Sequence, residues 1–121
     1  MDLCACLEVP FILEPMQTAA IPTGIAIAIE GGYEGQIRAR SGIALKHSII
    51  VTNAPGTIDS DYRGEVKVIL TNLGPIPYTI QPEERIAQLV IAPVIKAKVR
   101  IVKELPQTKR GKGGFGSSGK T

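Results

Sequence analysis

Short stretches in which apolar and polar residues alternate are the strongest structural signal in this chain. Residues 33–40 place Tyr, Gly, Ile and Ala on one side and Glu, Gln and two Arg residues on the other, which is the pattern of a half-exposed β-strand. Residues 25–29 alternate Ile with Ala, so we expect a strand with both faces covered. Residues 66–70 and 95–102 also alternate, and the second stretch predicts a last strand with a largely basic, solvated outer face.

Proline and glycine divide these stretches. Pro10 and Pro15 interrupt residues 9–16, so any strand there is short or lies at a sheet edge. Further turn signals are Gly31-Gly32, Pro55-Gly56 and the Asn-Leu-Gly-Pro run at residues 72–75, and another short strand is expected at residues 78–81. Several short strands separated by turns predict an all-β sandwich or barrel.

Residues 40–47 are the one stretch that favours a helix. Ser41 is a good N-cap, but the segment is too short to be stable without packing. Unpaired N–H groups behind Ser41 and the guanidinium of Arg40 in front of it would attract an anion. Arg40, Ser41 and Gly42 are therefore candidate phosphate ligands; the alternative is that they only begin a helix. We expect His47 to be a packed or hydrogen-bonded turn residue.

The stretch from Asn53 to Glu65 reads Asn-Ala-Pro-Gly-Thr-Ile-Asp-Ser-Asp-Tyr-Arg-Gly-Glu and is more polar than a structural turn requires. Because alternating residues follow it, we interpret it as the connection of a β-hairpin. Its main chain can present N–H and C=O groups to the edge of a base, with Asp59 nearby as a proton acceptor. The ring of Tyr62 offers a flat surface for a sugar. The alternative is that Asp59 and Asp61 are solvated turn carboxylates.

Composition sets the class of protein. A chain of 121 residues with 44% hydrophobic and 21% charged residues fits one globular domain. No apolar run reaches membrane-spanning length, and the N-terminus lacks the basic region of a signal peptide. We therefore expect a cytoplasmic protein, with a nuclear or organellar location left open for a eukaryotic chain. Cys4 and Cys6 lack the partners of a zinc site and are expected to be reduced structural thiols.

The basic surplus is confined to the C-terminus. The net charge of the chain is +3, yet residues 105–121 hold four basic residues and no acid, so the rest, with ten basic and eleven acidic residues, has a net charge of −1. We expect residues 1–104 to form the folded domain and residues 105–121 a flexible, glycine-rich arm. Composition alone allows such an arm to be solvated, to contact nucleic acid or to close over a polyphosphate.

Five motifs in this sequence resemble those of the trimeric dUTP pyrophosphatases (dUTPases). Residues 53–65 resemble the third motif, and residues 39–44 resemble the second, Pro-Arg-Ser-Gly-Leu-Ala, with Ala39 in place of proline and Ile43 in place of leucine. Residues 84–89 resemble the fourth, with Glu83 in place of a glycine that commonly serves a turn. The first and fifth motifs are represented by Asp2-Leu3-Cys4-Ala5 and by residues 110–119, with Ser118 in place of the more usual threonine.

The resemblance implies a jelly-roll-like β-barrel that assembles as a homotrimer, with sites at the subunit interfaces that the arm of one subunit closes. It also implies hydrolysis of dUTP to dUMP and pyrophosphate, a reaction that keeps uracil out of DNA and supplies dUMP for thymidylate synthesis. Mg²⁺ bound to the triphosphate is the implied cofactor, with Asp2 near it through water. No nucleic-acid or membrane partner is expected.

The resemblance also assigns roles to individual residues. Asp59 would be the general base that activates the attacking water, and Tyr62 would pack against deoxyribose and leave no room for a 2′-hydroxyl. Uracil would be framed, and the methyl group of thymine rejected, by Asn53, Gly56, Thr57, Ile58 and Lys67. The phosphates would be bound by Arg40, Ser41, Gly42, Gln88, Arg110, Gly116, Ser117 and Ser118, with Phe115 stacking on uracil.

Two other functions stay open at this point. A dCTP deaminase of the same fold would need a positioned glutamate and would release ammonia. A regulatory protein without catalytic activity would keep the nucleotide pocket alone. The presence of Asp59 and of the glycine-rich arm favours the hydrolase over both.

Overall fold

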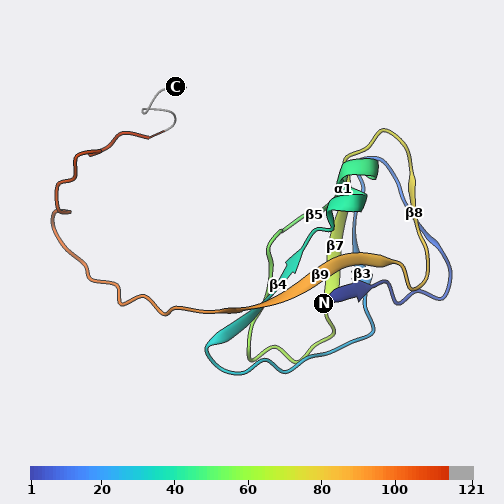
Figure 1. Cartoon of the computed structure of the whole chain (residues 1–121), viewed down its shortest axis with the longest axis horizontal. Coiled ribbons are helices and arrows are strands. Elements are labelled where there is room, and N and C mark those ends of the chain that lie inside the picture. The colour runs from blue at the N-terminus through green and yellow to red at the C-terminus, as the bar shows by residue number, and fades with distance from the viewer. Residues whose placement is uncertain (115–121) are drawn as a thin grey trace.

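The computed structural model describes residues 1–114, which form a body of short strands followed by an extended C-terminal segment (Figure 1). The described residues contain nine strands and one helix. In chain order they are β1 (Asp2–Cys4), β2 (Phe11–Leu13), β3 (Thr18–Pro22), β4 (Tyr33–Arg38), α1 (Ser41–His47), β5 (Ile49–Val51), β6 (Gly56–Ile58), β7 (Lys67–Asn72), β8 (Tyr78–Ile80) and β9 (Arg85–Pro93). Nothing in this part of the chain is a helix long and apolar enough to span a membrane.

The strands form three antiparallel sheets. One has the order β1-β9-β4-β6, the second β3-β7-β5, and the third pairs β2 with β8. Strand β9 pairs along one edge with β1 and along the other with β4. The all-β prediction is therefore confirmed, and the arrangement is jelly-roll-like, although the sheets of residues 1–114 are not hydrogen-bonded into one closed barrel.

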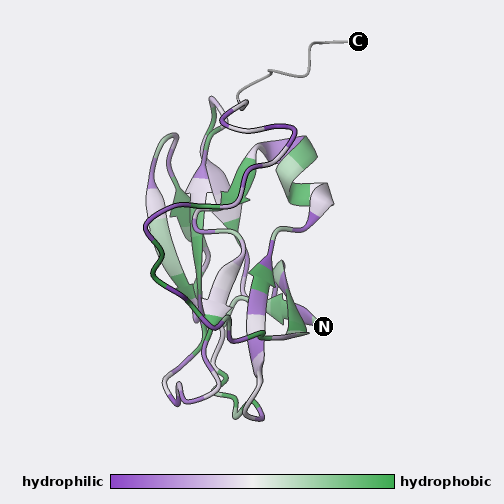
Figure 2. Ribbon diagram, turned by 90° about the vertical axis from the view of Figure 1, so that its left-hand side faces the viewer, coloured by the Kyte–Doolittle hydropathy of each residue, from purple (hydrophilic) through white to green (hydrophobic). Residues whose placement is uncertain are grey.

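Alternation along the strands directs one set of side chains into a shared core. In Figure 2, apolar and hydrophilic residues mix along the strands of the body. The largest fully buried apolar side chains come from different sheets: Leu3, Leu13, Ile21, Ile49, Leu70, Ile80 and Ile86. Burial of one such side chain favours folding by about 1.5–3 kcal/mol. The core therefore holds the three sheets together.

The strand predicted at residues 25–29 is wrong. These residues follow β3 without regular secondary structure, and Ile25 is 37% exposed. Both edges of β4, the strand that follows, are taken by β6 and β9, and this segment pairs with none of the strands of residues 1–114. One main-chain hydrogen bond, from Val66 N–H to the Ile25 carbonyl, attaches it to the body.

The last strand predicted at residues 95–102 is also wrong. Strand β9 ends at Pro93, and the following residues extend away from the body (Figure 1). Ile95 and Ile101 are 90% and 100% exposed. The alternation is present, but among residues 1–114 no strand lies beside this segment to bury its apolar side.

Helix α1 forms where it was predicted, but its N-cap differs. The N-cap is Arg40, in an extended conformation with φ −92° and ψ 126°, and Ser41 is the first helical residue. No side chain caps the N-terminus, so the predicted Ser41 cap is wrong. Burial of Ile43 and the left-handed residue Ser48, whose N–H bonds back to the helix, hold this short element in place.

The predicted hairpin is correct for its strands and wrong for its connection. Strand β5 pairs with β7, and Val51 lies opposite Leu70. The connection, however, contains β6, which pairs with β4 and so belongs to the β1-β9-β4-β6 sheet. Gly56 permits the close approach, because a Cβ there would lie 3.2 Å from Cβ of Ile37. The connection thus bridges two sheets and carries Asp59 directly after β6.

Candidate active site

The connection between β5 and β7 forms one wall of a cleft of about 290 Å³, which we call the β6 cleft. Apart from Phe115, which lies outside the described residues, its lining includes every residue predicted to contact the base or the sugar, together with the predicted general base: Asn53, Gly56, Thr57, Ile58, Asp59, Tyr62 and Lys67. Ala20 and Glu65, which the sequence did not single out, complete part of the lining. The predicted residues, which come from the fifteen positions 53–67, therefore share one concave surface.

Asp59 lies at the point where β6 ends and the chain turns. Its side chain is exposed, and its carbonyl oxygen accepts a hydrogen bond of 3.1 Å from the N–H of Tyr62. This turn places the carboxylate and the phenol on the same short loop. A carboxylate in this position can accept a proton from a water molecule in the cleft.

Tyr62 folds back over its own loop. Its hydroxyl donates a hydrogen bond of 2.9 Å to the carbonyl oxygen of Glu65. A Cβ on Gly64 would lie 2.4 Å from the Tyr62 hydroxyl oxygen and 2.6 Å from its Cζ. Gly64 is therefore needed for this ring position, a requirement that the Tyr-x-Gly spacing in the sequence could have indicated.

A second cleft, of about 410 Å³, lies beside the helix and is called here the α1 cleft. It is lined by all the residues of the body that were predicted to act on the phosphates or the metal: Asp2, Arg40, Ser41, Gly42 and Gln88. It also contains Ile43, Lys46, His47, Tyr78 and Glu84, for which no role was predicted. The predicted phosphate ligands thus meet at one end of α1.

Asp2 is held between two arginines at this cleft. Its carboxylate lies 3.7 Å from Nε of Arg40 and 3.2 Å from Nη1 of Arg85. Arg40 also donates a hydrogen bond of 2.8 Å to the carbonyl oxygen of Arg85. In β1, Asp2 pairs with Gln88, whose amide donates to the Ala39 carbonyl at 2.9 Å. Asp2 is therefore an ordered residue of the sheet and not a frayed terminus.

The potential metal ligands at the α1 cleft suit a Mg²⁺ ion that is bound to the phosphates of a substrate. No group of three or more potential metal ligands is present among residues 1–114. Mg²⁺ in nucleotide sites usually keeps several waters and is bound by one or two carboxylates together with substrate phosphates. Asp2 beside the candidate phosphate ligands fits such a site, whereas both oxygens of the other carboxylate of the cleft, Glu84, accept hydrogen bonds from Tyr78 and Gln81.

Tyr78 closes the far side of the α1 cleft. Its hydroxyl donates a short hydrogen bond to Glu84, whose second oxygen accepts the N–H of Gln81 at 2.9 Å. Burial, together with this bond to Glu84, raises the pKa of Tyr78 well above its ordinary value. The exposed ring of His47 packs against Tyr78 with a centroid separation of 4.8 Å. The phenol therefore stays neutral and fixed near pH 7.

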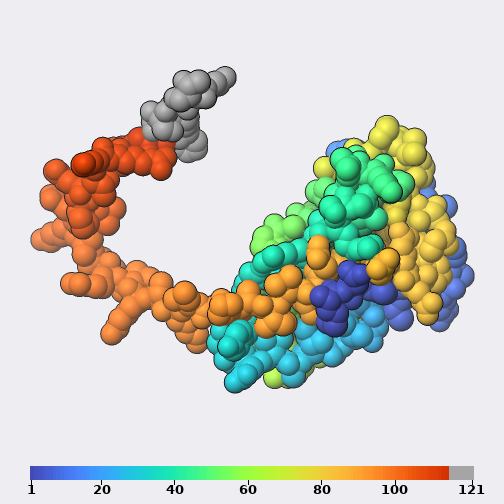
Figure 3. Space-filling model, in the orientation of Figure 1, coloured from blue at the N-terminus to red at the C-terminus, as the bar shows by residue number. Residues whose placement is uncertain are grey.

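The two clefts have no lining residue in common. Arg110 lies in neither; it belongs to the extended segment, where its Nε donates to the Gly113 carbonyl at 2.7 Å. The space-filling view shows this segment leaving the body after β9 (Figure 3). Phe115, Gly116, Ser117 and Ser118 lie outside the described residues. One copy of the chain thus presents its predicted site residues in separate places.

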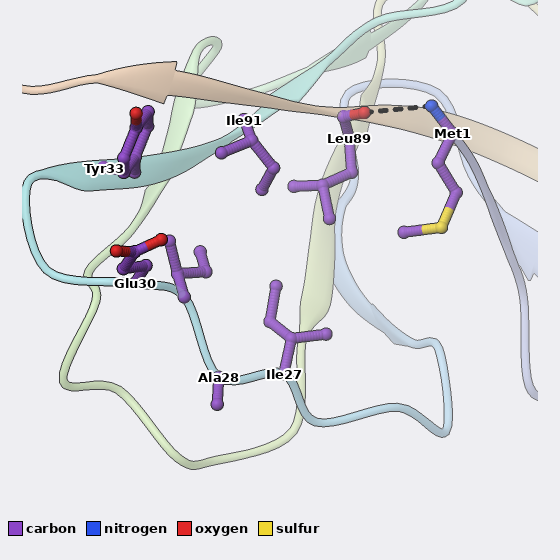
Figure 4. Close-up of a pocket in the computed structure, with 8 residues that line it drawn as sticks. Met1, Ile27, Ala28, Glu30, Tyr33, Leu89 and Ile91 are labelled. Atoms are coloured by element: carbon purple, nitrogen blue, oxygen red, sulfur yellow. Dashed lines mark hydrogen bonds between the residues drawn. The ribbon is translucent and has the colours of Figure 1, made fainter.

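A third hollow, of about 650 Å³, is apolar and is called the apolar groove. Ile27, Leu89 and Ile91 point toward one another in it, and the Met1 amino group donates to the Leu89 carbonyl at 3.0 Å (Figure 4). Its remaining lining residues are Ala28, Ile29, Glu30 and Tyr33. This groove has a larger volume than either of the two clefts, but it lacks the paired polar groups that hydrolysis requires.

Comparisons with known proteins agree with the motifs. The sequence profile of the dUTPase family matches residues 1–119. A deoxyuridine 5′-triphosphate nucleotidohydrolase of Desulfotalea psychrophila is 56% identical over 119 residues, which cover 98% of this chain and 79% of the relative.

Solved structures give the same result. A mutant dUTPase of Staphylococcus bacteriophage 80alpha, solved with dUpNHpp, has a TM-score of 0.82 and 30% identity, covering 98% of this chain and 84% of that one. A mutant dUTPase of S. aureus phage phi11, described with a structural Mg(II) ion, has a TM-score of 0.75 and 25% identity, covering 85% of this chain and 82% of that one.

Proposed function

This chain belongs to the dUTPase family and hydrolyses dUTP to dUMP and pyrophosphate, and we propose that Asp59 is the base that activates the attacking water. The observation that carries this role is the β6 cleft, in which Asp59 shares one surface with the candidate base and sugar ligands. A general base must lie within reach of the proton it removes, and the place of Asp59 in the lining of this cleft supports that role.

The proposed reaction is an in-line attack of water on the α-phosphorus. As the new oxygen–phosphorus bond forms, Asp59 accepts a proton from the water, and the bond from the α-phosphorus to the bridging oxygen breaks. Pyrophosphate leaves with the bridging oxygen, and dUMP keeps the oxygen of the water. Fixed donors aimed at the developing negative charge supply much of the rate in reactions of this kind.

The α1 cleft supplies those donors. Arg40 contributes its guanidinium, Ser41 and Gly42 contribute main-chain N–H groups of the first helical turn, and Gln88 contributes its amide. Mg²⁺ bound to the triphosphate would neutralise charge on the phosphate oxygens, and Asp2 would hold its water ligands. Arg110 and the arm that follows it would close over the phosphates and exclude bulk water.

The β6 cleft selects the nucleoside. Asn53 and the main chain of Gly56, Thr57 and Ile58 would read the polar edge of uracil, and Lys67 would frame the base and exclude the methyl group of thymine. Tyr62, held by its bond to the Glu65 carbonyl, would pack on deoxyribose and leave no space for a 2′-hydroxyl. Specificity for deoxyuridine would therefore come from one loop.

The separation of the two clefts supports a homotrimer with shared sites. A nucleotide whose base lies in the β6 cleft of one copy would reach the α1 cleft of a neighbour. The apolar groove and the alternating apolar side chains of residues 94–102 are exposed in one copy and would be covered by others. Covering such surface is a strong driving force for association.

One assay tests the reaction. The chain is incubated with dUTP, UTP, dTTP or dCTP in water enriched in oxygen-18, and pyrophosphate, ammonia and labelled products are measured. We expect pyrophosphate release from dUTP with the label in dUMP. Label in pyrophosphate would contradict attack at the α-phosphorus, and ammonia release from dCTP would indicate a deaminase.

A further inference from the structure

Glu65 and Val66, which line the β6 cleft, are hydrogen-bonded to residues 23–25, the segment that follows β3. Gly24 donates its N–H to Oε1 of Glu65 at 3.0 Å. On the same stretch, the Thr23 hydroxyl donates to the Val66 carbonyl at 2.6 Å, and Val66 N–H donates to the Ile25 carbonyl at 2.9 Å. This part of the lining is therefore fixed from outside the loop that carries Asp59.

The second oxygen of Glu65 faces Lys67. Its Oε2 lies 3.7 Å from the ammonium nitrogen of Lys67, and the two side chains are 37% and 53% exposed. Both residues line the β6 cleft. Residues two apart in an extended chain project to the same side, so the pair follows from the backbone.

The main chain of Glu65 also holds Tyr62 in the lining of the same cleft, because its carbonyl oxygen accepts the Tyr62 hydroxyl. A lysine ammonium sits on a flexible four-carbon stem and takes many positions unless a partner restrains it. Without the Glu65 carboxylate, nothing else in residues 1–114 forms an ion pair with Lys67.

We propose that Glu65 is a positioning residue for base specificity, acting through Lys67. Its carboxylate anchors the ammonium at the edge of the β6 cleft, which keeps the lysine stem in place beside the base and maintains the exclusion of a methylated base. This inference rests on the proposed role of Lys67 in framing uracil. A half-exposed ion pair contributes little to folding, so its effect belongs in substrate selection and not in stability.

The test uses Glu65→Gln, which keeps an oxygen for the Gly24 N–H and removes the charge. Lys67→Met keeps most of the stem and removes the ammonium, and the double variant combines the two. The measurements are kcat and KM for dUTP, the inhibition constant of dTTP against dUTP hydrolysis, and the melting temperature. Glu8→Gln, an exposed acid that lines neither cleft, is the matched control.

We expect Glu65→Gln to lower the ratio of the dTTP inhibition constant to the dUTP KM by roughly three- to fivefold, the size of an exposed ion pair. The kcat for dUTP and the melting temperature should stay near those of the unmodified chain and of Glu8→Gln. Lys67→Met should lower this ratio at least as far, whatever its effect on kcat, and the double variant should lose no more of the ratio than Lys67→Met alone.

An unchanged ratio in Glu65→Gln, or additive losses in the double variant, would overturn the proposal. Failure of the unmodified chain to hydrolyse dUTP would instead overturn the proposed function. The two failures are therefore separate results of one set of assays.

Discussion

The Asp2 carboxylate and the Arg40 guanidinium form an ion pair at the α1 cleft, with Oδ1 of Asp2 3.7 Å from Nε of Arg40. The two residues come from the first strand and from the N-cap of the helix, so the pair joins the first and second motifs in space. A carboxylate in this position can orient the Arg40 guanidinium, and under the proposed function it would also offer an oxygen to the water shell of a metal ion.

Replacing Asp2 by Asn should raise the Mg²⁺ concentration that gives half-maximal hydrolysis. Asn keeps the shape of the side chain but removes the negative charge that would hold metal-bound water. Stability should change by no more than about 1 kcal/mol, because the ion pairs are partly exposed. A Mg²⁺ titration of dUTP hydrolysis checks this, and an unchanged midpoint would remove Asp2 from the metal site.

Replacing Asp59 by Asn should lower kcat by about 10²- to 10⁴-fold, the usual contribution of a general base. Binding of dUpNHpp should persist, because the amide has the same shape as the carboxylate. The Asp-Ser-Asp sequence provides a matched control: Asp61 is exposed and lines neither cleft, so Asp61→Asn should stay within a few-fold of the unmodified rate. Equal losses in both variants would point to loop electrostatics in place of proton transfer.

The motifs indicated which residues lie together better than alternation predicted the strands. Ser41 and Gln88 lie far apart in the chain, yet both line the α1 cleft, as the motif assignments require. Alternation at residues 25–29 and 95–102 identifies the apolar side of each segment, but it does not show whether a neighbouring strand is available to pair with it. Ile95 and Ile101 keep the pattern of a strand while fully exposed in one copy of the chain.

The features of the site that the sequence did not reveal depend on contacts between residues far apart in the chain. The hydrogen bond from Gly24 N–H to the Glu65 carboxylate joins residues forty-one positions apart, and no local sequence pattern indicates it. Strand β6 joins the sheet of β4, whereas β5 and β7 on either side of it belong to a different sheet, and nothing in the local sequence indicates this change of sheet. Local propensity describes neither long-range relationship.

Asn72 and Asn53 differ in burial and in expected role, because the first should support the fold and the second should contact the substrate. Asn72 is fully buried; its amide donates to the carbonyls of Leu13 and Ile76, and its oxygen accepts the Gly74 N–H. Asn72→Ala should therefore cost about 2–4 kcal/mol, since it leaves the buried Leu13 carbonyl and Gly74 N–H unpaired, together with the partly buried Ile76 carbonyl. Asn53→Ala, at an exposed position, should leave the unfolding free energy nearly unchanged and weaken dUTP binding. Urea unfolding and substrate titrations check the pair; a stable Asn72→Ala variant would contradict the role of this network.

Removing the chain from Lys109 onward should abolish most hydrolysis and leave the body folded. Residues 109–114 pack against no strand, and the hydrogen bonds of Arg110 and Gly111 stay within the segment. The melting temperature of the truncated chain should match that of the full chain, while kcat/KM falls steeply. Arg110→Ala in the full chain should reproduce part of the loss. A lowered melting temperature would mean that the arm supports the fold rather than the reaction.

Glu83 occupies the place of the fourth motif's glycine and has φ of 62°, in the left-handed region that favours glycine. Its N–H still donates to the Ala5 carbonyl at 2.8 Å, so the turn is made in spite of the side chain. A non-glycine residue in this region destabilises the folded state by roughly 1–2 kcal/mol. Replacement by glycine removes this cost but also increases the conformational entropy of the unfolded chain, which offsets part of the gain. Glu83→Gly should thus stabilise the protein by about 0.5–1 kcal/mol in urea unfolding. Glu8→Gly, at an exposed position with no positive φ, should bring no gain. A destabilised Glu83→Gly variant would show that the glutamate side chain contributes more than its backbone costs.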